Sequence, residues 1–170
     1  LPGVNDLKLS SEATSAIFLG KVARWNDPLI AASNPDVELP DIPITVVARA
    51  DASGTTFVTT RHLSAISPEF AQTIGVTMEP SWPKVLKKRG ALIRGKGNGG
   101  VAAFVKAVPG AIGYVQYAYA HLTQMQMASL QNQAGLYVAP RSESFLAAIE
   151  SFKAELDLTQ VADPFGADAY

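Results

Sequence analysis

Apolar residues in this chain follow two patterns, one typical of buried strands and one typical of helices. Residues 44–48 (ITVVA) form a continuous, mostly β-branched run, which is typical of a strand buried on both faces. Residues 142–156 instead place Phe145, Ile149 and Phe152 at helical spacing. Because strands that alternate with helices pack in layers around one core, the pattern predicts an α/β layered domain with one compact unit.

Capping residues mark where several helices are expected to begin. Residues 67–74 start with Ser-Pro-Glu, an N-cap followed by Pro at the first helical position and an acid in the first turn. Residues 9–20 predict a helix that Ser10 or Ser11 caps and Gly20 ends. A short helix is also predicted at residues 29–33. A longer helix is predicted at residues 53–66, with Ser53 as its cap and an inward face made of Phe57, Leu63 and Ile66. Another is predicted at residues 98–108, with Asn98 as its cap and an inward face made of Val101, Phe104, Val105 and Val108.

The rest of the chain predicts shorter elements and connections. Residues 79–100 are rich in Lys, Arg and Gly and are expected to be loop-like. The AIGYVQY run at residues 111–117 is a predicted strand. Residues 118–127 predict a helical turn or more, and residues 131–140 predict a turn with a short strand.

Composition narrows the classes of function. The 170 residues are 48% hydrophobic, enough for a sizeable core, and carry a formal net charge of -1. That charge gives no general attraction to nucleic acid or acidic membranes, so any anion binding must come from local geometry. The lack of cysteine excludes disulfides and thiol catalysis, and no apolar run approaches the roughly 20 residues of a membrane span. The chain starts with Leu-Pro-Gly and ends at GADAY, and we expect it to be a piece of something longer.

The candidate chemistry lies where the buried strand ends, in the stretch ITVVARADASGTTF. In open α/β sheets, a turn from the carboxyl end of a strand into a helix is the usual ligand position. The first backbone N–H groups of such a helix have no partner inside it, and they attract an oxyanion. Gly54 lets a ligand approach the backbone, while Ser53 and Thr55 add hydroxyl donors. Arg49 can supply a two-pronged charged contact, with Asp51 holding its guanidinium.

Two alternatives to this interpretation stay open. The DASGT segment could serve only as a helix cap, since Asp, Ser and Thr all cap helices; the arginine at the strand end favours a ligand. Asp51 could also accept a proton from a protonated ligand, which would favour an anion that still carries a hydrogen.

Three segments of the chain carry a resemblance to a known family. ITVVARADASGTTF contains the pattern Arg-x-Asp-x-Ser-Gly-Thr after a strand, and IFLGKVARWNDPLIAASNP contains G-K-x-x-x-W-N-D-P. GKGNGGVAAFVKAVPGAIGYVQYAYA follows the patterns G-K-G-N-x-G-V-A-x-x-V and P-G-x-I-G-Y-V-x-Y-x-Y-A. These segments span most of Ile17 to Ala120, and they resemble, in order, the periplasmic phosphate-binding proteins of ABC-type phosphate transporters.

The resemblance implies one lobe of a two-lobed type II periplasmic-binding-protein fold, with a central mixed, mostly parallel sheet flanked by helices. Residues 1–170 would form the second lobe alone, because the family's first-lobe contacts have no counterpart in the sequence. By resemblance, four residues would contact phosphate and Asp51 would pair with the arginine among them. The four are Arg49, Ser53, Gly54 and Thr55.

The resemblance also implies a role and partners. The chain would be the solute-binding component of a phosphate uptake system, not an enzyme, and would need no metal or cofactor. Its partners would be inorganic phosphate, the first lobe of the same protein and a membrane permease, with no nucleic acid. Its location would be periplasmic or extracellular, with a lipid anchor on the full-length protein left open.

The sequence departs from the family pattern at two places. Ala52 stands where the family often has glycine, which suits a helix start. Residues 84–94 (KVLKKRGALIR) are longer than the short glycine-rich link of the family. Their charges could steer anions, although we expect a solvated surface loop. The charged residues are Lys84, Lys87, Lys88, Arg89 and Arg94.

Other motifs give weaker signals. GKGNGG, residues 95–100, lacks the spacing of a phosphate loop and is interpreted as a turn plus a helix cap. His62 and His121 are too isolated for a metal site, and His62 is expected at the surface. Five aromatic residues could stack on a ligand, but core packing is the commoner role of such positions. They are Trp25, Trp82, Tyr114, Tyr117 and Tyr119.

Two other functions remain as alternatives. A phosphatase or phosphoryl-transfer domain could use the same anion cradle, but it would need a nucleophile with a metal or a base. DASGT is not G-x-S-x-G, and no His can be assigned as a base for Ser53. A sensory lobe could share the fold and bind another oxyanion.

Overall fold

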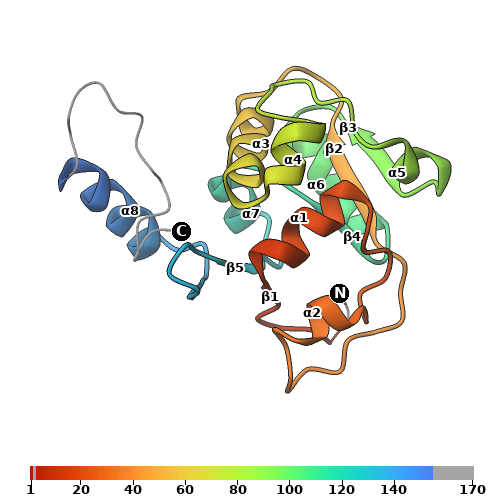
Figure 1. The fold of residues 1–170 in the computed structure, drawn as a ribbon, viewed down its shortest axis with the longest axis horizontal. Coiled ribbons are helices and arrows are strands. Elements are labelled where there is room, and N and C mark those ends of the chain that lie inside the picture. Colours follow the sequence, from red (N-terminus) through yellow and green to blue (C-terminus); the bar gives the residue numbers. More distant parts are fainter. Residues whose placement is uncertain (2, 155–170) are drawn as a thin grey trace.

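The computed structural model describes residues 1 and 3–154, with side chains described as far as residue 150. Within this range the chain is an α/β structure (Figure 1). Its elements are β1 (Lys8–Leu9), α1 (Ser11–Leu19), α2 (Pro28–Ala31), β2 (Thr45–Arg49), α3 (Gly54–Ile66), α4 (Pro68–Thr73), α5 (Lys84–Lys88), β3 (Leu92–Gly95), α6 (Gly97–Ala107), β4 (Ala111–Gly113), α7 (Tyr117–Leu122), β5 (Ser129–Gln131), β6 (Tyr137–Val138) and α8 (Ser142–Ala154).

The central sheet is parallel, with strand order β3-β2-β4. The β-branched run forms its middle strand, and Val46, Val47 and Ala48 are all buried. This confirms the strand predicted at residues 44–48, displaced by one residue. The register pairs Arg49 at the end of β2 with Gly95 at the end of β3, so both strands finish at the same edge.

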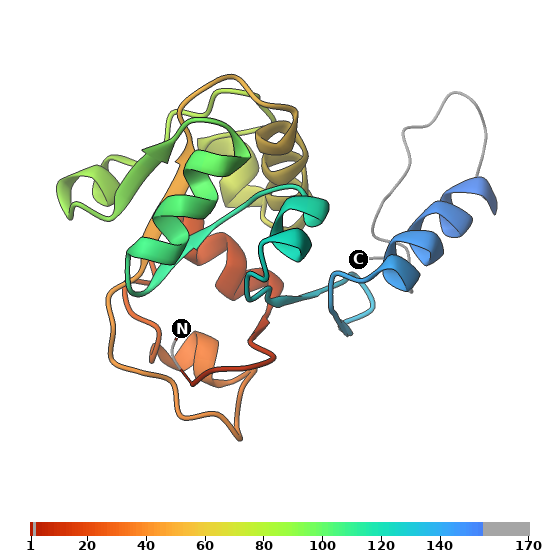
Figure 2. The ribbon, with the colours of Figure 1, turned by 180° about the vertical axis from the view of Figure 1, so that it is seen from behind.

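Helices cover both faces of this sheet. Helix α6 crosses one face (Figure 2), and Gly113 of β4 permits its close approach because a Cβ there would lie 2.9 Å from Val101 Cγ1. Helices α1, α3 and α4 lie on the other face (Figure 1). The main apolar core forms on this second face, where Val46 joins Ile17, Leu63 and other buried residues.

A smaller sheet combines the beginning and the end of the described chain. Strand β1 pairs in parallel with β5, and β5 pairs antiparallel with β6. Figure 1 shows α8, which follows β6, at the opposite end of the molecule from α5. Both sheets together make a mixed, mostly parallel set of strands flanked by helices, which confirms the predicted fold class.

Three predicted Ser N-caps are confirmed, and Asp27 caps α2 in the same way. Each capping side chain accepts a backbone N–H from the first turn of its helix, as expected for Ser and Asp N-caps. The caps are Ser10 for α1, Asp27 for α2, Ser53 for α3 and Ser67 for α4. Helix α1 ends at Gly20, whose φ of 74° is the left-handed conformation that glycine tolerates.

The prediction of a loop over residues 79–100 is wrong. This segment contains helix α5 and strand β3, and Leu86 on α5 is only 1% exposed. The charged residues of α5 obscured its apolar anchor in the sequence. The prediction that Asn98 caps the next helix is also wrong, because the N-cap is Lys96 and Asn98 lies within α6, donating to Gln116 Oε1 at 3.2 Å.

Other predicted positions need smaller corrections. The strand expected at residues 111–117 ends at Gly113, and Tyr117 already belongs to α7. Phe57 and Phe104, predicted to face inward, are 41% and 40% exposed. The end of the helix predicted at residues 142–156 lies outside the described residues. No helix in the described part of the chain has the length and apolar character needed to cross a bilayer.

Candidate functional site

Two helices begin at the edge where β2 and β3 end. Helix α3 starts at Gly54, after a short turn from Arg49, and α6 starts at Gly97, two residues after Gly95. Because Arg49 and Gly95 are paired neighbours in the sheet, both turns lie at the same edge. This is the carboxyl edge of a parallel sheet, where open α/β folds bind ligands.

Arg49 and Asp51 form a two-pronged ion pair at this edge. Arg49 Nε donates to Asp51 Oδ1 at 3.0 Å, and Nη2 donates to Oδ2 at 2.5 Å. The Arg49 side chain is 12% exposed and that of Asp51 37% exposed. The guanidinium hydrogen bonds hold the pKa of Asp51 well below its usual range, and the carboxylate raises the pKa of Arg49. Both groups therefore stay charged at neutral pH, and Asp51 pairs with the guanidinium as the sequence predicts.

The start of α6 also contacts Asp51. The Gly97 N–H donates to Asp51 Oδ1 at 3.0 Å and further lowers the pKa of the carboxyl. Gly97 has a φ of +64°, and Gly95 packs so tightly against α6 that a Cβ would lie 2.5 Å from the Gly100 carbonyl carbon. Gly97 is not among the site residues that the sequence predicts. Its only signal is the glycine spacing of GKGNGG, a motif that predicts a turn plus a helix cap.

The first turn of α3 presents backbone donors. Ser53 Oγ accepts the Thr56 N–H at 3.3 Å, and Ser53 is 4% exposed, so it acts as a buried N-cap. The N–H groups of Gly54 and Thr55 have no acceptor among the residues that the structure describes. A Cβ placed on Gly54 would meet no heavy atom within 4 Å, so the space beside this turn is open.

The Tyr114 hydroxyl contacts both the end of β2 and the first turn of α3. The hydroxyl oxygen accepts the Arg49 N–H at 3.3 Å and lies 3.0 Å from Thr56 Oγ1. The Tyr114 ring packs in a cluster with Phe18 and Trp82, at centroid distances of 6.3 and 6.5 Å. Of the aromatic residues predicted to be core or stacking positions, Trp25 and Trp82 are core residues.

A hollow of about 280 Å³ adjoins the Arg49–Asp51 pair. Arg94 from β3 also lines it, with Nη2 donating to Pro80 O at 3.4 Å. Of the basic residues in 84–94, Arg89 instead donates to Gly20 O at 2.6 Å. The full lining is Arg49, Ala50, Asp51, Glu79, Pro80, Ser81 and Arg94.

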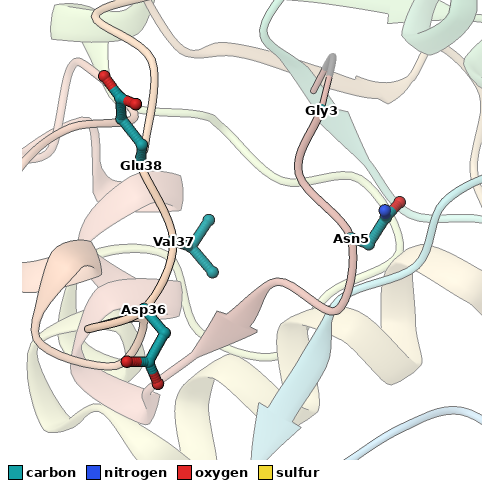
Figure 3. A pocket seen from close by; sticks show the side chains of 5 residues that line it. All are labelled: Gly3, Asn5, Asp36, Val37 and Glu38. Carbon is teal, nitrogen blue, oxygen red and sulfur yellow. The ribbon is translucent and has the colours of Figure 1, made fainter.

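A second hollow, of about 430 Å³, lies elsewhere on the molecule (Figure 3). Its lining comes from the start of the chain and from the connection between α2 and β2, and it includes the carboxylates of Asp36 and Glu38. Acidic side chains repel an oxyanion, so this hollow does not compete with the edge of the sheet as an anion site.

The two histidines take no part in the candidate site. Burial lowers the pKa of His62 to about 4, so this half-buried side chain of α3 is neutral at pH 7, and the expectation of a surface position is wrong. His121 is exposed and stacks on Tyr117 at 5.5 Å. Within residues 1 and 3–154, no three His, Asp or Glu side chains gather in a way that could hold a metal ion.

The arrangement suits non-covalent binding of a small oxyanion. It combines a fixed guanidinium, two free backbone donors and the positive end of the α3 dipole. The Arg49 charge is balanced by Asp51, so the site discriminates by directed hydrogen bonds more than by net charge.

Comparison with known proteins identifies the family of the chain. A family model described as "PBP superfamily domain" matches residues 2–170. The chain is 51% identical over 142 residues to the phosphate-binding protein PstS of Pasteurella multocida, covering 84% of this chain and 39% of that protein. It is 39% identical over 183 residues to PstS of Methanocaldococcus jannaschii, covering 100% of this chain and 46% of that protein. The chain thus spans less than half the length of these curated relatives.

Solved structures show the same fold. A high-affinity periplasmic phosphate-binding protein (PfluDING) bound with phosphate is 24% identical, with a TM-score of 0.64 over 98% of this chain and 43% of that one. A human phosphate-binding apolipoprotein is 25% identical, with a TM-score of 0.61 over 88% of this chain and 42% of that one. The backbone therefore corresponds to a part of these larger proteins.

Proposed function

Because the chain belongs to the PBP superfamily, we propose that it binds inorganic phosphate non-covalently at the amino end of α3. The Arg49–Asp51 pair beside the free N–H groups of Gly54 and Thr55 carries this proposal. The names of the two curated relatives described above, both phosphate-binding proteins, support phosphate as the ligand.

Each proposed contact has a defined chemical role. Gly54 and Thr55 donate backbone N–H bonds to phosphate oxygens, and the Thr55 hydroxyl adds a third donor. The Ser53 oxygen already accepts the Thr56 N–H, which leaves its hydroxyl proton to donate to the ligand. Arg49 contributes the charged contact with the guanidinium nitrogens that face away from Asp51.

Asp51 gives a basis for preferring phosphate over sulfate. Its Oδ1 accepts two hydrogen bonds, from Arg49 Nε and from the Gly97 N–H, whereas Oδ2 accepts only one in the described part of the chain. The lone pair left on Oδ2 can accept a hydrogen from a protonated phosphate. Sulfate has no proton at neutral pH, so the lone pair on Asp51 Oδ2 would repel the nearest sulfate oxygen.

The proposal extends to the whole protein. We take residues 1–170 as the second lobe of a two-lobed solute-binding protein, whose first lobe supplies the remaining donors when the cleft closes over the ligand. The partners are then that first lobe and the membrane permease of an ABC-type phosphate transporter, in a periplasmic or extracellular setting. The relatives' greater length supports this extension.

The proposed role is binding without catalysis. The Ser53 hydroxyl caps α3, and no histidine lies in its described contacts. Hydrolysis of a phosphomonoester that disappears in Ser53→Ala would contradict this role and favour the phosphatase alternative.

Calorimetric titration of the 170-residue chain at low salt tests the proposal. We expect weak phosphate binding, with an affinity poorer than micromolar because a single lobe offers part of the donors, and still weaker binding of sulfate. Arg49→Ala should abolish the phosphate heat, whereas Arg24→Ala, which breaks a surface ion pair with Asp41, should not. Equal binding of phosphate by both variants would contradict the assigned site.

A further inference from the structure

The Tyr114 hydroxyl joins the two elements that form the proposed phosphate site. It accepts the N–H of Arg49, the last residue of β2, at 3.3 Å. It also shares a hydrogen bond of 3.0 Å with Thr56 Oγ1, in the first turn of α3. One oxygen therefore connects the residue that carries the guanidinium to the helix turn that carries the free N–H groups.

Strand geometry explains why this hydroxyl is needed. Strand β4 ends at Gly113, which pairs with Val47, so the ladder between β2 and β4 stops before Arg49. The Arg49 N–H would otherwise face the end of that ladder without a carbonyl partner. Tyr114 follows β4 directly, and its hydroxyl supplies the missing acceptor.

Two buried aromatic side chains pack against the ring of Tyr114. Phe18 and Trp82, which are 5% and 2% exposed, surround it in one aromatic cluster. A ring fixed in this way keeps its hydroxyl in one place, unlike a side chain that can change rotamer freely. The hydroxyl therefore acts as a rigid spacer between β2 and α3.

We infer that Tyr114 is a positioning residue for phosphate, setting the distance and direction between the Arg49 guanidinium and the N–H groups of Gly54 and Thr55. The inference rests on the proposed function for its ligand. Without the hydroxyl, the Arg49 N–H and the fully buried Thr56 hydroxyl both lose a partner. Because buried polar groups without partners are costly, the turn between β2 and α3 shifts to find new ones.

Tyr114→Phe tests this role, with Tyr137→Phe as a matched control. Both changes remove one hydroxyl and keep the ring; the Tyr137 hydroxyl bonds Ser33 Oγ at 2.7 Å, away from the edge of the central sheet. Two quantities are measured in each variant: the amide hydrogen exchange rate of Arg49 without ligand, and the dissociation constant for phosphate. In Tyr114→Phe we expect exchange at Arg49 to rise about tenfold and phosphate binding to weaken about fivefold, the range of one lost hydrogen bond.

Substitutions at Thr56 provide an independent test from the other side of the bridge. Thr56→Val removes the hydroxyl that meets Tyr114 and should weaken phosphate binding, whereas Thr56→Ser keeps the hydroxyl and should bind as the unchanged chain does. This pair decides the question if Tyr114→Phe does not fold.

Three outcomes are distinguishable. Equal exchange at Arg49 and equal phosphate affinity in Tyr114→Phe and Tyr137→Phe would overturn the inference. Loss of phosphate affinity in Thr56→Ser as large as in Thr56→Val would also overturn it. If the unchanged chain binds no phosphate, the proposed function fails, and exchange at Arg49 alone then decides whether Tyr114 positions this turn.

Discussion

Gly95→Ala should damage both stability and the proposed site, because β3 and α6 touch at this residue. A Cβ on Gly95 would lie 2.5 Å from the Gly100 carbonyl carbon and from Val101 N. These are backbone atoms, which cannot rotate away as a side chain can. Ordinary contact begins at 3.4 Å, so the two backbones must separate by about 1 Å.

The size of the effect follows from this geometry. Overpacking against fixed neighbours typically costs about 1–3 kcal/mol of the free energy of unfolding. With a urea dependence of about 2 kcal/mol per molar, typical of small domains, the unfolding midpoint should fall by about 0.5–1.5 M. The same movement should draw the Gly97 N–H away from Asp51, and the Gly97 amide resonance should therefore shift in a nuclear magnetic resonance spectrum.

Gly54→Ala is the matched control for stability. No heavy atom lies within 4 Å of a Cβ placed there, so the substitution should leave the urea midpoint unchanged or raise it by up to about 0.5 M. It should still weaken phosphate binding, because the new methyl narrows the open space beside α3. An unchanged midpoint in Gly95→Ala, with folded structure confirmed by circular dichroism, would refute the argument that β3 and α6 are in backbone contact.

Three further predictions concern charge. Arg49→Lys keeps the charge but loses the two-pronged pairing with Asp51, so calorimetry should show phosphate binding weakened about tenfold. Folding lowers the pKa of Asp51, so the ionised carboxylate adds to the free energy of unfolding above about pH 4, and this contribution is lost as the pH falls through the lowered pKa. The free energy of unfolding of Asp51→Asn in urea should therefore depend less on pH below 4 than that of the unchanged chain. Identical pH profiles of the two proteins would contradict the pairing of Asp51 with Arg49. Arg94→Gln should weaken phosphate binding at low salt and much less at high salt, because Arg94 lines the hollow beside Arg49, while Lys88→Gln on α5 should have no comparable effect.

Local signals in the sequence located the candidate site. A strand of β-branched residues and a Ser N-cap depend on neighbours in sequence, so β2 and the start of α3 were predictable. The pairing of Arg49 with Asp51 was also predictable, because the two residues are separated by one position at a strand end.

Contacts between distant segments were not predictable. Strand β3 (LIRG) contains a charged residue and follows a basic helix, so only its pairing with β2 reveals it as a strand. On α3 the buried side carries Thr56, Thr60 and Leu63, and threonines gave no apolar signal for that face. Phe57 was therefore assigned inward wrongly.

The contacts of Asp51 and Tyr114 with other elements belong to the same class. The Gly97 N–H that donates to Asp51 is a backbone group 46 residues away along the chain. Because almost every residue has a backbone N–H, the sequence does not indicate which of them donates to Asp51. Tyr114 is predicted within a strand at residues 111–117, whereas β4 ends at Gly113. Its hydrogen bonds to Arg49 and Thr56 depend on the β4–β2 register and on the position of α3.

The most direct measurement of the central claim is a phosphate titration of the isotopically labelled chain, followed by nuclear magnetic resonance. If phosphate binds at the amino end of α3, the largest shifts will occur at the Gly54 and Thr55 amides, and they will vanish in Arg49→Ala. Shifts confined to the basic surface of α5, or none at Gly54 and Thr55, would contradict the proposed site.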